Sequence, residues 1–527
     1  MKRFIKDWGL TILLGVIILA IAFVARIYHL TLLPVFADEA IYIRWSQVMG
    51  AEPTLRFLPL SDGKQPLFMW LLMFAVTRFS DPLFIGRLVS VFSGLGTIIG
   101  IGFLSHLLFK NKKVALISGF IWAVSPFSFF FDRMALVDSL LACFGIWSIV
   151  LAVLTAKTQR LDMALLTGFA LGGAVLTKSP GVFIAALVPL TILLSDLPKS
   201  FRKLFFHIAK IMALFVVSFV IAGLMYNIQR LGPNFNMLFS RTADYVFPIS
   251  HLWQNPKDPF IPNFHRSLEY LWIMGPVGVM ALGLISLVTN FKKYPREIIF
   301  LLICWLFPVA FQAMFAKVFT ARYVLYAIPF VFLISGAAFL SKNKYVKMIA
   351  WLAGLAFLGQ SLWFNYWLVT NPARADLPRG ERSGYLEEWT AGTGIKEVSE
   401  YLKNQHAQDP NHQIVVGTEG YFGTLPDGLQ IYMQGTPSVV VVGVGLNLTE
   451  VPSNLTNALR AGDKTYLVIN SSRIKIEKED YALSGLKLIK EYPKAERPYG
   501  YKEYVVMGPR DYLLFFEVVT SLPGLKL

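Results

Sequence analysis

About eleven long apolar runs follow one another through the first 370 residues of this 527-residue chain. Hydrophobic residues make up 55% of the sequence and charged residues only 16%, whereas about a quarter of a typical soluble protein is charged. Because about 20 apolar residues cross the hydrocarbon core of a bilayer as a helix, these runs predict an all-α polytopic membrane domain with about 11 transmembrane helices. The predicted spans are residues 9–32, 83–109, 114–131, 135–155, 161–177, 180–196, 204–229, 267–290, 297–316, 321–340 and 347–370.

Clusters of Lys and Arg lie between alternate runs, as in "MKRFIK", "FKNKK", "KTQR", "LPKSFRK", "FKKYPRE" and "SKNKYVK". Such clusters are enriched in cytoplasmic loops. We therefore expect a cytoplasmic N-terminus and, with an odd number of spans, a C-terminus outside the cell membrane, extracellular or periplasmic. The formal net charge of +16 is divided among short loops and forms no continuous face, which excludes nucleic acid as a partner.

The membrane domain is predicted to cover residues 1–370, with long outer loops at 33–82 and 231–265. The first loop contains "KQPLFMWLLMFAVTRF", which is too short to cross and return, so we expect a helix lying in the membrane interface. A small extracytoplasmic α/β domain is predicted for residues 371–527. Its β-branched runs "HQIVVG", "SVVVVGV", "KTYLVIN" and "YKEYVVMG" predict strands, and "GIKEVSEYLKNQH" predicts a helix.

Ionisable residues collect at the predicted outer boundary of the membrane. Two adjacent carboxylates, Asp38 and Glu39, follow the first apolar run directly. An ionisable group beside hydrocarbon is costly and usually marks a functional site with a partner. Several such groups on one face therefore predict a site there. The others lie in "DGKQPLF", "FFFDRMALVDSLL", "AVLTKSPG" and "FTARYVLYAIP" and are Lys64, Arg133, Asp138, Lys178, Arg322 and Tyr323.

This mixture of groups suits transfer of a sugar from a lipid-linked phosphate. A carboxylate can take the proton of an acceptor hydroxyl as it attacks. Lys and Arg can hold the leaving phosphate and offset its developing charge. A polyprenyl chain would lie among the spans with its phosphate at the interface, which explains an acid pair at the boundary between lipid and water.

The order of these motifs resembles the C-type membrane glycosyltransferases (GT-C fold), in particular the protein O-mannosyltransferase and lipid A aminoarabinose transferase group. The likeness covers roughly residues 10–340. It implies Asp38 as the base, Glu39 as its essential neighbour and Lys64 as a ligand of the donor phosphate. It also implies a polyprenyl- or dolichyl-phosphate sugar, inversion at the anomeric carbon and action on the non-cytoplasmic side. The aminoarabinose transferases carry an Arg three residues after the Asp, where this chain has Ile41.

No cofactor is firmly implied, although a divalent metal remains open. His251 and His265 lie in or beside the second outer loop near acidic residues, and His and carboxylates are ligand types for zinc and manganese. Their spacing matches no tight ligand motif, so we interpret them as loop histidines that face water or pack.

The sequence thus predicts an integral-membrane glycosyltransferase, a hexosyl- or pentosyltransferase, that acts on a hydroxyl of an acceptor protein, lipid or wall polymer. One alternative is a transporter or flippase of lipid-linked saccharides, which would show midplane polar sites and paired broken spans. The other is an en bloc oligosaccharide transferase, which would call for a metal-bound acidic site and a larger outer domain. Neither the sugar nor the acceptor is specified by the sequence.

Overall fold

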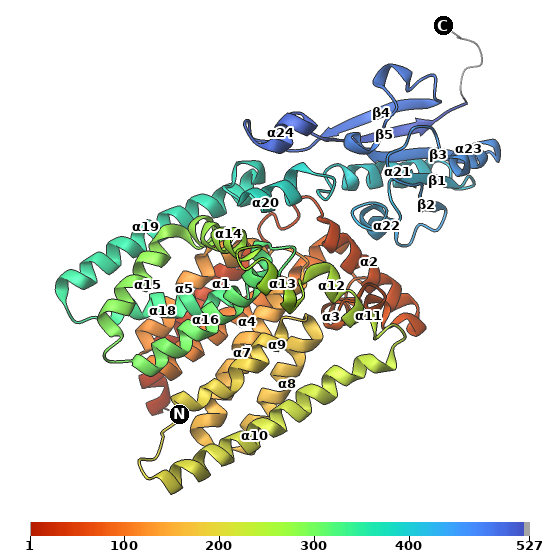
Figure 1. The fold of residues 1–527 in the computed structure, drawn as a ribbon. Helices are drawn as coiled ribbons and strands as arrows, with labels where there is room; N and C mark the ends of the chain where they lie inside the picture. The colour runs from red at the N-terminus through yellow and green to blue at the C-terminus, as the bar shows by residue number, and fades with distance from the viewer. Residues whose placement is uncertain (1, 521–527) are drawn as a thin grey trace. The chain divides into compact units, whose positions relative to one another are not determined.

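The computed structural model describes residues 2–520 (Figure 1). Contacts within the chain divide it into two compact units. The helical unit takes in the chain up to Leu30, then Glu52–Leu72 and Arg87–Pro378. The mixed unit takes in Thr31–Ala51, Met73–Gly86 and the chain from Arg379 onward.

The helical unit consists of helices joined by short turns. Its helices, two of which run on into residues of the mixed unit, are α1 (Lys2–Ile27), α3 (Leu67–Met73), α4 (Pro82–Phe109), α5 (Lys112–Val124), α6 (Pro126–Phe131), α7 (Val137–Thr158), α8 (Leu161–Thr177), α9 (Gly181–Leu187), α10 (Phe201–Asn227), α11 (Met237–Ser240), α12 (Thr242–Tyr245), α13 (Ile249–Gln254), α14 (Phe260–Ile273), α15 (Pro276–Asn290), α16 (Pro295–Phe315), α17 (Ala321–Val324), α18 (Ile328–Gly336) and α19 (Lys344–Thr370).

Six helices of the described chain are long and apolar enough to cross a membrane, which confirms a multi-pass membrane protein. They are α1, α4, α7, α10, α16 and α19. The pair α14 and α15, bent by 101° at its break, adds a seventh if it counts as one span. The predicted number of about eleven is not confirmed, because the apolar segments Leu161–Thr177, Gly181–Leu194 and Ile328–Leu340 are shorter than a full crossing. The apolar stretch after Lys64 forms only the seven-residue α3.

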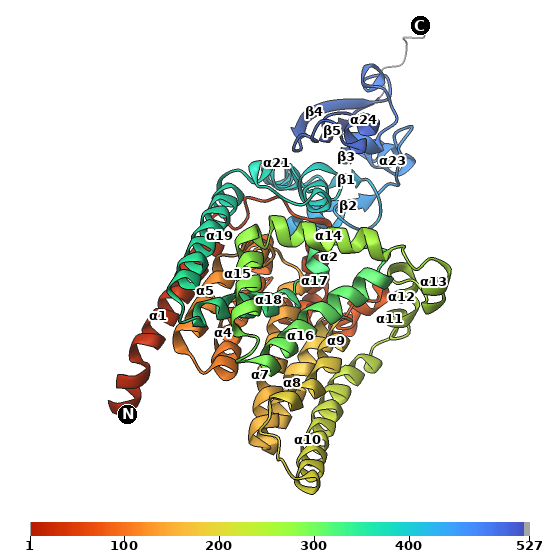
Figure 2. The ribbon, with the colours of Figure 1, turned by 60° about the vertical axis from the view of Figure 1, so that its left-hand side comes forward.

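Small residues bring neighbouring helices of this unit together. Helix α8 packs between α7 and α10 (Figure 2). A Cβ atom added at Gly168 on α8 would come within 2.8 Å of the Ser218 carbonyl oxygen on α10. The Ser218 hydroxyl donates a hydrogen bond to the Ala164 carbonyl oxygen at 2.7 Å. Close approach at glycine with interhelical hydrogen bonds is how membrane helices associate without a hydrophobic driving force between them.

The mixed unit contains a five-stranded sheet in the order β2-β1-β3-β5-β4 (Figure 1). Strand β1 is parallel to both of its neighbours, and β5 is antiparallel to β3 and β4. Every residue of β1 is buried, as expected for a central parallel strand with both faces covered. The elements are β1 (Ile414–Thr418), β2 (Val439–Gly443), β3 (Lys464–Asn470), β4 (Leu486–Pro493), β5 (Tyr512–Val518), α2 (Ala37–Ala51), α20 (Arg379–Arg382), α21 (Ile395–Gln408), α22 (Asp427–Met433), α23 (Ser453–Arg460) and α24 (Lys502–Met507).

Three of the predicted strands are β1, β2 and β3, and the predicted helix is α21, so the α/β character of this part is confirmed. The strand predicted in "YKEYVVMG" is wrong, because these residues form α24. Val505 and Val506 are exposed there, and β-branched residues favour a strand only where neighbouring strands cover them. The segment lies between Gly500 and Gly508, both at positive φ. The sheet instead gains β4 and β5.

Candidate active site

The acid pair lies in the first turn of α2, in the mixed unit. Glu39 is fully buried, and its Oε2 accepts a hydrogen bond from the Phe36 backbone N–H at 3.0 Å. A Glu that reaches back to the residue before its helix is half of a capping box, and carboxylates here also interact favourably with the helix dipole. Glu39 therefore stabilises the turn, whereas the half-buried Asp38 keeps access to solvent.

Helix α2 packs against α22. Arg44 Nε donates a hydrogen bond to Gln430 Oε1 at 3.1 Å, and Gln47 Nε2 donates to the Ile431 carbonyl oxygen at 2.9 Å. The Trp45 ring stacks on Phe422 with centroids 5.7 Å apart. The acid pair is thus carried by a helix that packs within the sheet-containing unit, although α2 and α22 lie more than 300 residues apart in the sequence.

A cluster of predicted site residues forms within the helical unit. Lys178, just after α8, places its Nζ 2.6 Å from Oδ1 of Asp138 in the first turn of α7. The same Nζ lies 4.2 Å from the centroid of the Tyr323 ring. The Arg322 guanidinium lies 5.3 Å from the centroid of that same ring. No described residue hydrogen-bonds to the buried Oδ2 of Asp138. Lys and Arg side chains gathered in this way can bind a phosphate through charge-assisted hydrogen bonds.

Lys64 lies in a turn joined to this cluster by a neighbouring side chain. Its Nζ is 3.4 Å from Oδ2 of Asp62, which also pairs with Arg241 in the loop that follows α10. Gln65 Nε2 donates a hydrogen bond to Ser179 Oγ at 2.7 Å. Because Ser179 follows Lys178 in the chain, the Lys64 turn lies beside the turn that carries Lys178.

Arg133 has other partners. Its buried guanidinium donates hydrogen bonds to the carbonyl oxygens of Ala25, Arg26, Tyr28 and His29, between 2.6 and 3.2 Å. These carbonyl groups lie at and just after the end of α1, where no N–H group of the helix is placed to donate to them. Its phosphate-binding role stays a prediction.

A buried ion pair next to Arg133 was not expected from the sequence. Arg26 Nε lies 3.0 Å from Asp132 Oδ2, with both side chains buried. Arg26 also donates to the Ala123 carbonyl oxygen and to Ser128, and Ser139 Oγ donates to Asp132 Oδ1 at 2.8 Å. The one feature of the sequence that points to this pair is Arg26 itself, a single Arg at the end of the first apolar run.

Replacing Asp132 by Ala should strongly destabilise the protein, because it leaves the Arg26 guanidinium buried without its counter-ion. Breaking a buried pair from one side typically costs about 3–5 kcal/mol. The unfolding midpoint in detergent can be followed with a thiol-reactive dye, since Cys304 is buried and Cys143 partly buried. Asp162→Ala, which breaks the exposed pair with Arg160, is the control and should leave the midpoint unchanged. Equal midpoints for the two variants would contradict the structural role of the Arg26–Asp132 pair.

The two histidines lie on α13 and α14. His251 stacks on Phe247 and lies 3.7 Å from Asp258, and His265 is exposed on α14. Among residues 2–520, no group of three or more His, Cys, Asp or Glu side chains is placed to hold a metal ion.

Comparisons with known proteins bear on both the family and the fold. Residues 63–222 match the family model described as dolichyl-phosphate-mannose-protein mannosyltransferase. The structure is similar to that of ArnT from Cupriavidus metallidurans bound to undecaprenyl phosphate, with a TM-score of 0.55 and 16% identity over 97% of this chain and 99% of that chain. The apo state of the same protein gives 0.53 and 14% over the same shares. No curated protein sequence matches the chain significantly. The likeness over nearly the whole of both chains concerns the fold.

Proposed function

We propose, from the premise that this chain has the fold of the C-type membrane glycosyltransferases, that it moves a sugar from a polyprenyl-phosphate donor to a hydroxyl acceptor with inversion at the anomeric carbon. The observation that carries the proposal is the Lys178–Asp138 pair with Tyr323 and Arg322 beside it. The mannosyltransferase family model and the undecaprenyl phosphate bound to ArnT support a lipid-linked donor.

The donor phosphate would lie against Lys178 and Arg322, with Lys64 as a further ligand. The buried Asp138 would orient the Lys178 ammonium. Lys supplies a compact point charge, whereas Arg supplies a two-pronged contact to two phosphate oxygens. We leave Arg133 out of this set because its guanidinium already donates to backbone carbonyl oxygens.

In the reaction the acceptor hydroxyl attacks the anomeric carbon, and Asp38 takes the proton as the new C–O bond forms. The bond between the anomeric carbon and the phosphate oxygen breaks on the opposite face, and the polyprenyl phosphate leaves with the electron pair. The cations stabilise the charge that develops on the phosphate. Glu39 keeps the turn that carries Asp38 in place.

The basic clusters between apolar runs support a cytoplasmic N-terminus and a site on the non-cytoplasmic side. We propose that residues 1–370 form the transferase domain and that residues 371–527 form a domain on that same outer side. The acceptor would carry its hydroxyl on a protein, a lipid or a wall polymer.

The test is mass spectrometry of the membrane lipids of cells that lack the protein. We expect one polyprenyl-phosphate sugar to accumulate and to return to its normal level when the wild-type gene is restored. A lipid profile that does not change on deletion would overturn the proposed function. The mass of the accumulating lipid also shows whether the sugar is a hexose, a pentose or a modified sugar.

A further inference from the structure

One segment of the mixed unit connects the acid pair to the sheet. This segment, here called the strap, comprises residues 383–392 and follows α20. The Gly392 N–H donates to the Val35 carbonyl oxygen at 2.8 Å, and the Ala37 N–H donates to the Thr390 carbonyl oxygen at 3.1 Å. The Phe36 ring packs on Tyr385 with centroids 4.3 Å apart. The strap is therefore the backbone partner of the residues directly before Asp38.

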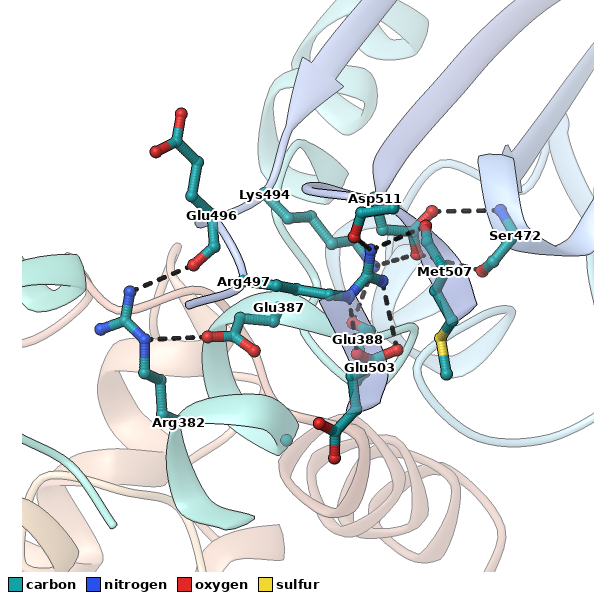
Figure 3. Close-up of polar contacts among 12 residues, drawn as sticks. Arg382, Glu387, Glu388, Ser472, Lys494, Glu496, Arg497, Glu503, Met507 and Asp511 are labelled. Carbon is teal, nitrogen blue, oxygen red and sulfur yellow. Dashed lines mark hydrogen bonds and ion pairs between the residues drawn. The ribbon is translucent and has the colours of Figure 1, made fainter. Parts of the chain in front are cut away.

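Cationic side chains hold the strap at Glu387 and Glu388, and Figure 3 shows three of them, Arg382, Arg497 and Lys494. Glu387 is fully buried and pairs with Arg379 at 2.5 Å and Arg382 at 2.8 Å. Glu388 receives a two-pronged contact from Arg497, at 3.0 and 3.4 Å. Lys494 Nζ donates to the Glu388 carbonyl oxygen at 2.8 Å. Such charge-assisted contacts are stronger and more directional than neutral hydrogen bonds.

The buried Lys494 and Arg497 are themselves fixed to the sheet edge. They lie between β4 and β5, and the Lys494 ammonium is 3.7 Å from the buried Asp511 carboxylate. Asp511 in turn accepts hydrogen bonds from the Ser471 hydroxyl and the Ser472 N–H, just after β3. Burial lowers the pKa of Lys494 to about 8, an effect that Asp511, Glu419 and Glu388 partly offset. The strap is thus attached to the edge of the sheet formed by β4 and β5.

Ion pairs that only stabilise a domain can lie at its surface, but the charged groups around the strap are deeply buried. Arg497 and Glu387 are charged groups withdrawn almost entirely from water, and such groups are costly unless they are paired. Both groups lie in or against the strap, which pairs with residues 35–37 directly before Asp38.

We propose that Arg497 and Glu388 are positioning residues, which act through the strap to fix the place of Asp38 for proton transfer. The sheet-containing unit then contributes to catalysis by positioning the base, in addition to any role in binding the acceptor. This inference rests on the proposed function for its catalytic consequence, while the strap contact itself can be measured without any substrate.

The test compares Arg497→Met with Arg510→Met in the full-length protein in lipid nanodiscs. Arg510 lies in the same connection but forms a more exposed pair with Glu496, so it is a matched control. Hydrogen exchange should become at least about tenfold faster at the Ala37 and Gly392 amides in Arg497→Met, because local opening of the strap needs less free energy. The amides of β1 and β3 should keep their wild-type rates. Arg510→Met should match the wild type throughout.

Transfer kinetics provide the second readout, with the lipid-linked sugar that accumulates in the deletion strain as donor. Arg497→Met should lower kcat about 10- to 100-fold, as expected for a misplaced catalytic group, with KM for the donor within about twofold of wild type, and Arg497→Lys should recover part of kcat. Unchanged exchange at Ala37 and Gly392, equal acceleration in β1 and β3, or an unchanged kcat would each overturn the positioning role. If the wild-type protein transfers no sugar, the proposed function fails, and the exchange data still decide whether Arg497 holds the strap.

Discussion

Asp38→Asn should abolish sugar transfer while the protein folds and inserts as the wild type does. The amide has nearly the same shape as the carboxylate but cannot accept the proton of the acceptor hydroxyl, and loss of a general base typically costs about 10²- to 10⁴-fold in rate. Asp38 is half-buried, whereas Glu39 makes the hydrogen bond that caps the turn. The substitution should therefore leave the helix start intact.

The measurement is complementation of the deletion strain, with the accumulating lipid-linked sugar as the readout. Asp38→Asn should leave the lipid at the deletion level, and the purified variant should unfold at the wild-type midpoint. Asp409→Asn, the same change at a carboxylate of the mixed unit outside the proposed site, should restore normal lipid levels. Normal turnover of the lipid by Asp38→Asn would remove Asp38 from the role of base.

Lys178→Met should also lower the rate of sugar transfer strongly, because it affects the leaving phosphate and not the acceptor hydroxyl. It removes a cation proposed to stabilise the leaving phosphate, and loss of one such contact typically costs about 10²- to 10³-fold in kcat. It also leaves the buried Asp138 carboxylate without its partner at 2.6 Å, so the variant should unfold at a lower temperature than the wild type.

The double variant Asp138→Asn with Lys178→Met separates the two effects. Removing both charges relieves the buried unpaired carboxylate, so the unfolding midpoint should recover toward the wild-type value. Transfer should stay as low as in Lys178→Met alone. If transfer recovered together with the midpoint, Lys178 would serve only to stabilise the fold.

Much of the fold could be predicted because it depends on local patterns. The apolar runs gave the positions of the long helices, and the β-branched runs gave β1, β2 and β3. The resemblance to the C-type glycosyltransferases is confirmed by the fold and by the match over residues 63–222. The strand predicted at α24 failed because exposure, which a short β-branched run does not reveal, decides between strand and helix there.

The partners of the site residues could not be predicted from the sequence. Asp138 and Lys178 were each identified as candidates, but their ion pair depends on the packing of α7 against α8. The contact between Glu388 and Arg497 joins residues more than 100 positions apart, and no local pattern marks either one. The partners of Arg133 and of Arg26 at the end of α1 likewise become known only when α6 and α7 are packed beside that helix end.

The central claim is that the cations around Lys178 bind the phosphate of a polyprenyl carrier. Native mass spectrometry of the full-length protein with undecaprenyl phosphate and with undecaprenol tests it most directly, because the two lipids differ only in the phosphate. We predict retention of undecaprenyl phosphate by the wild type, weaker retention by Arg322→Gln and by the double variant of Asp138 and Lys178, and little retention of undecaprenol. Equal retention of the two lipids by the wild-type protein would contradict the account.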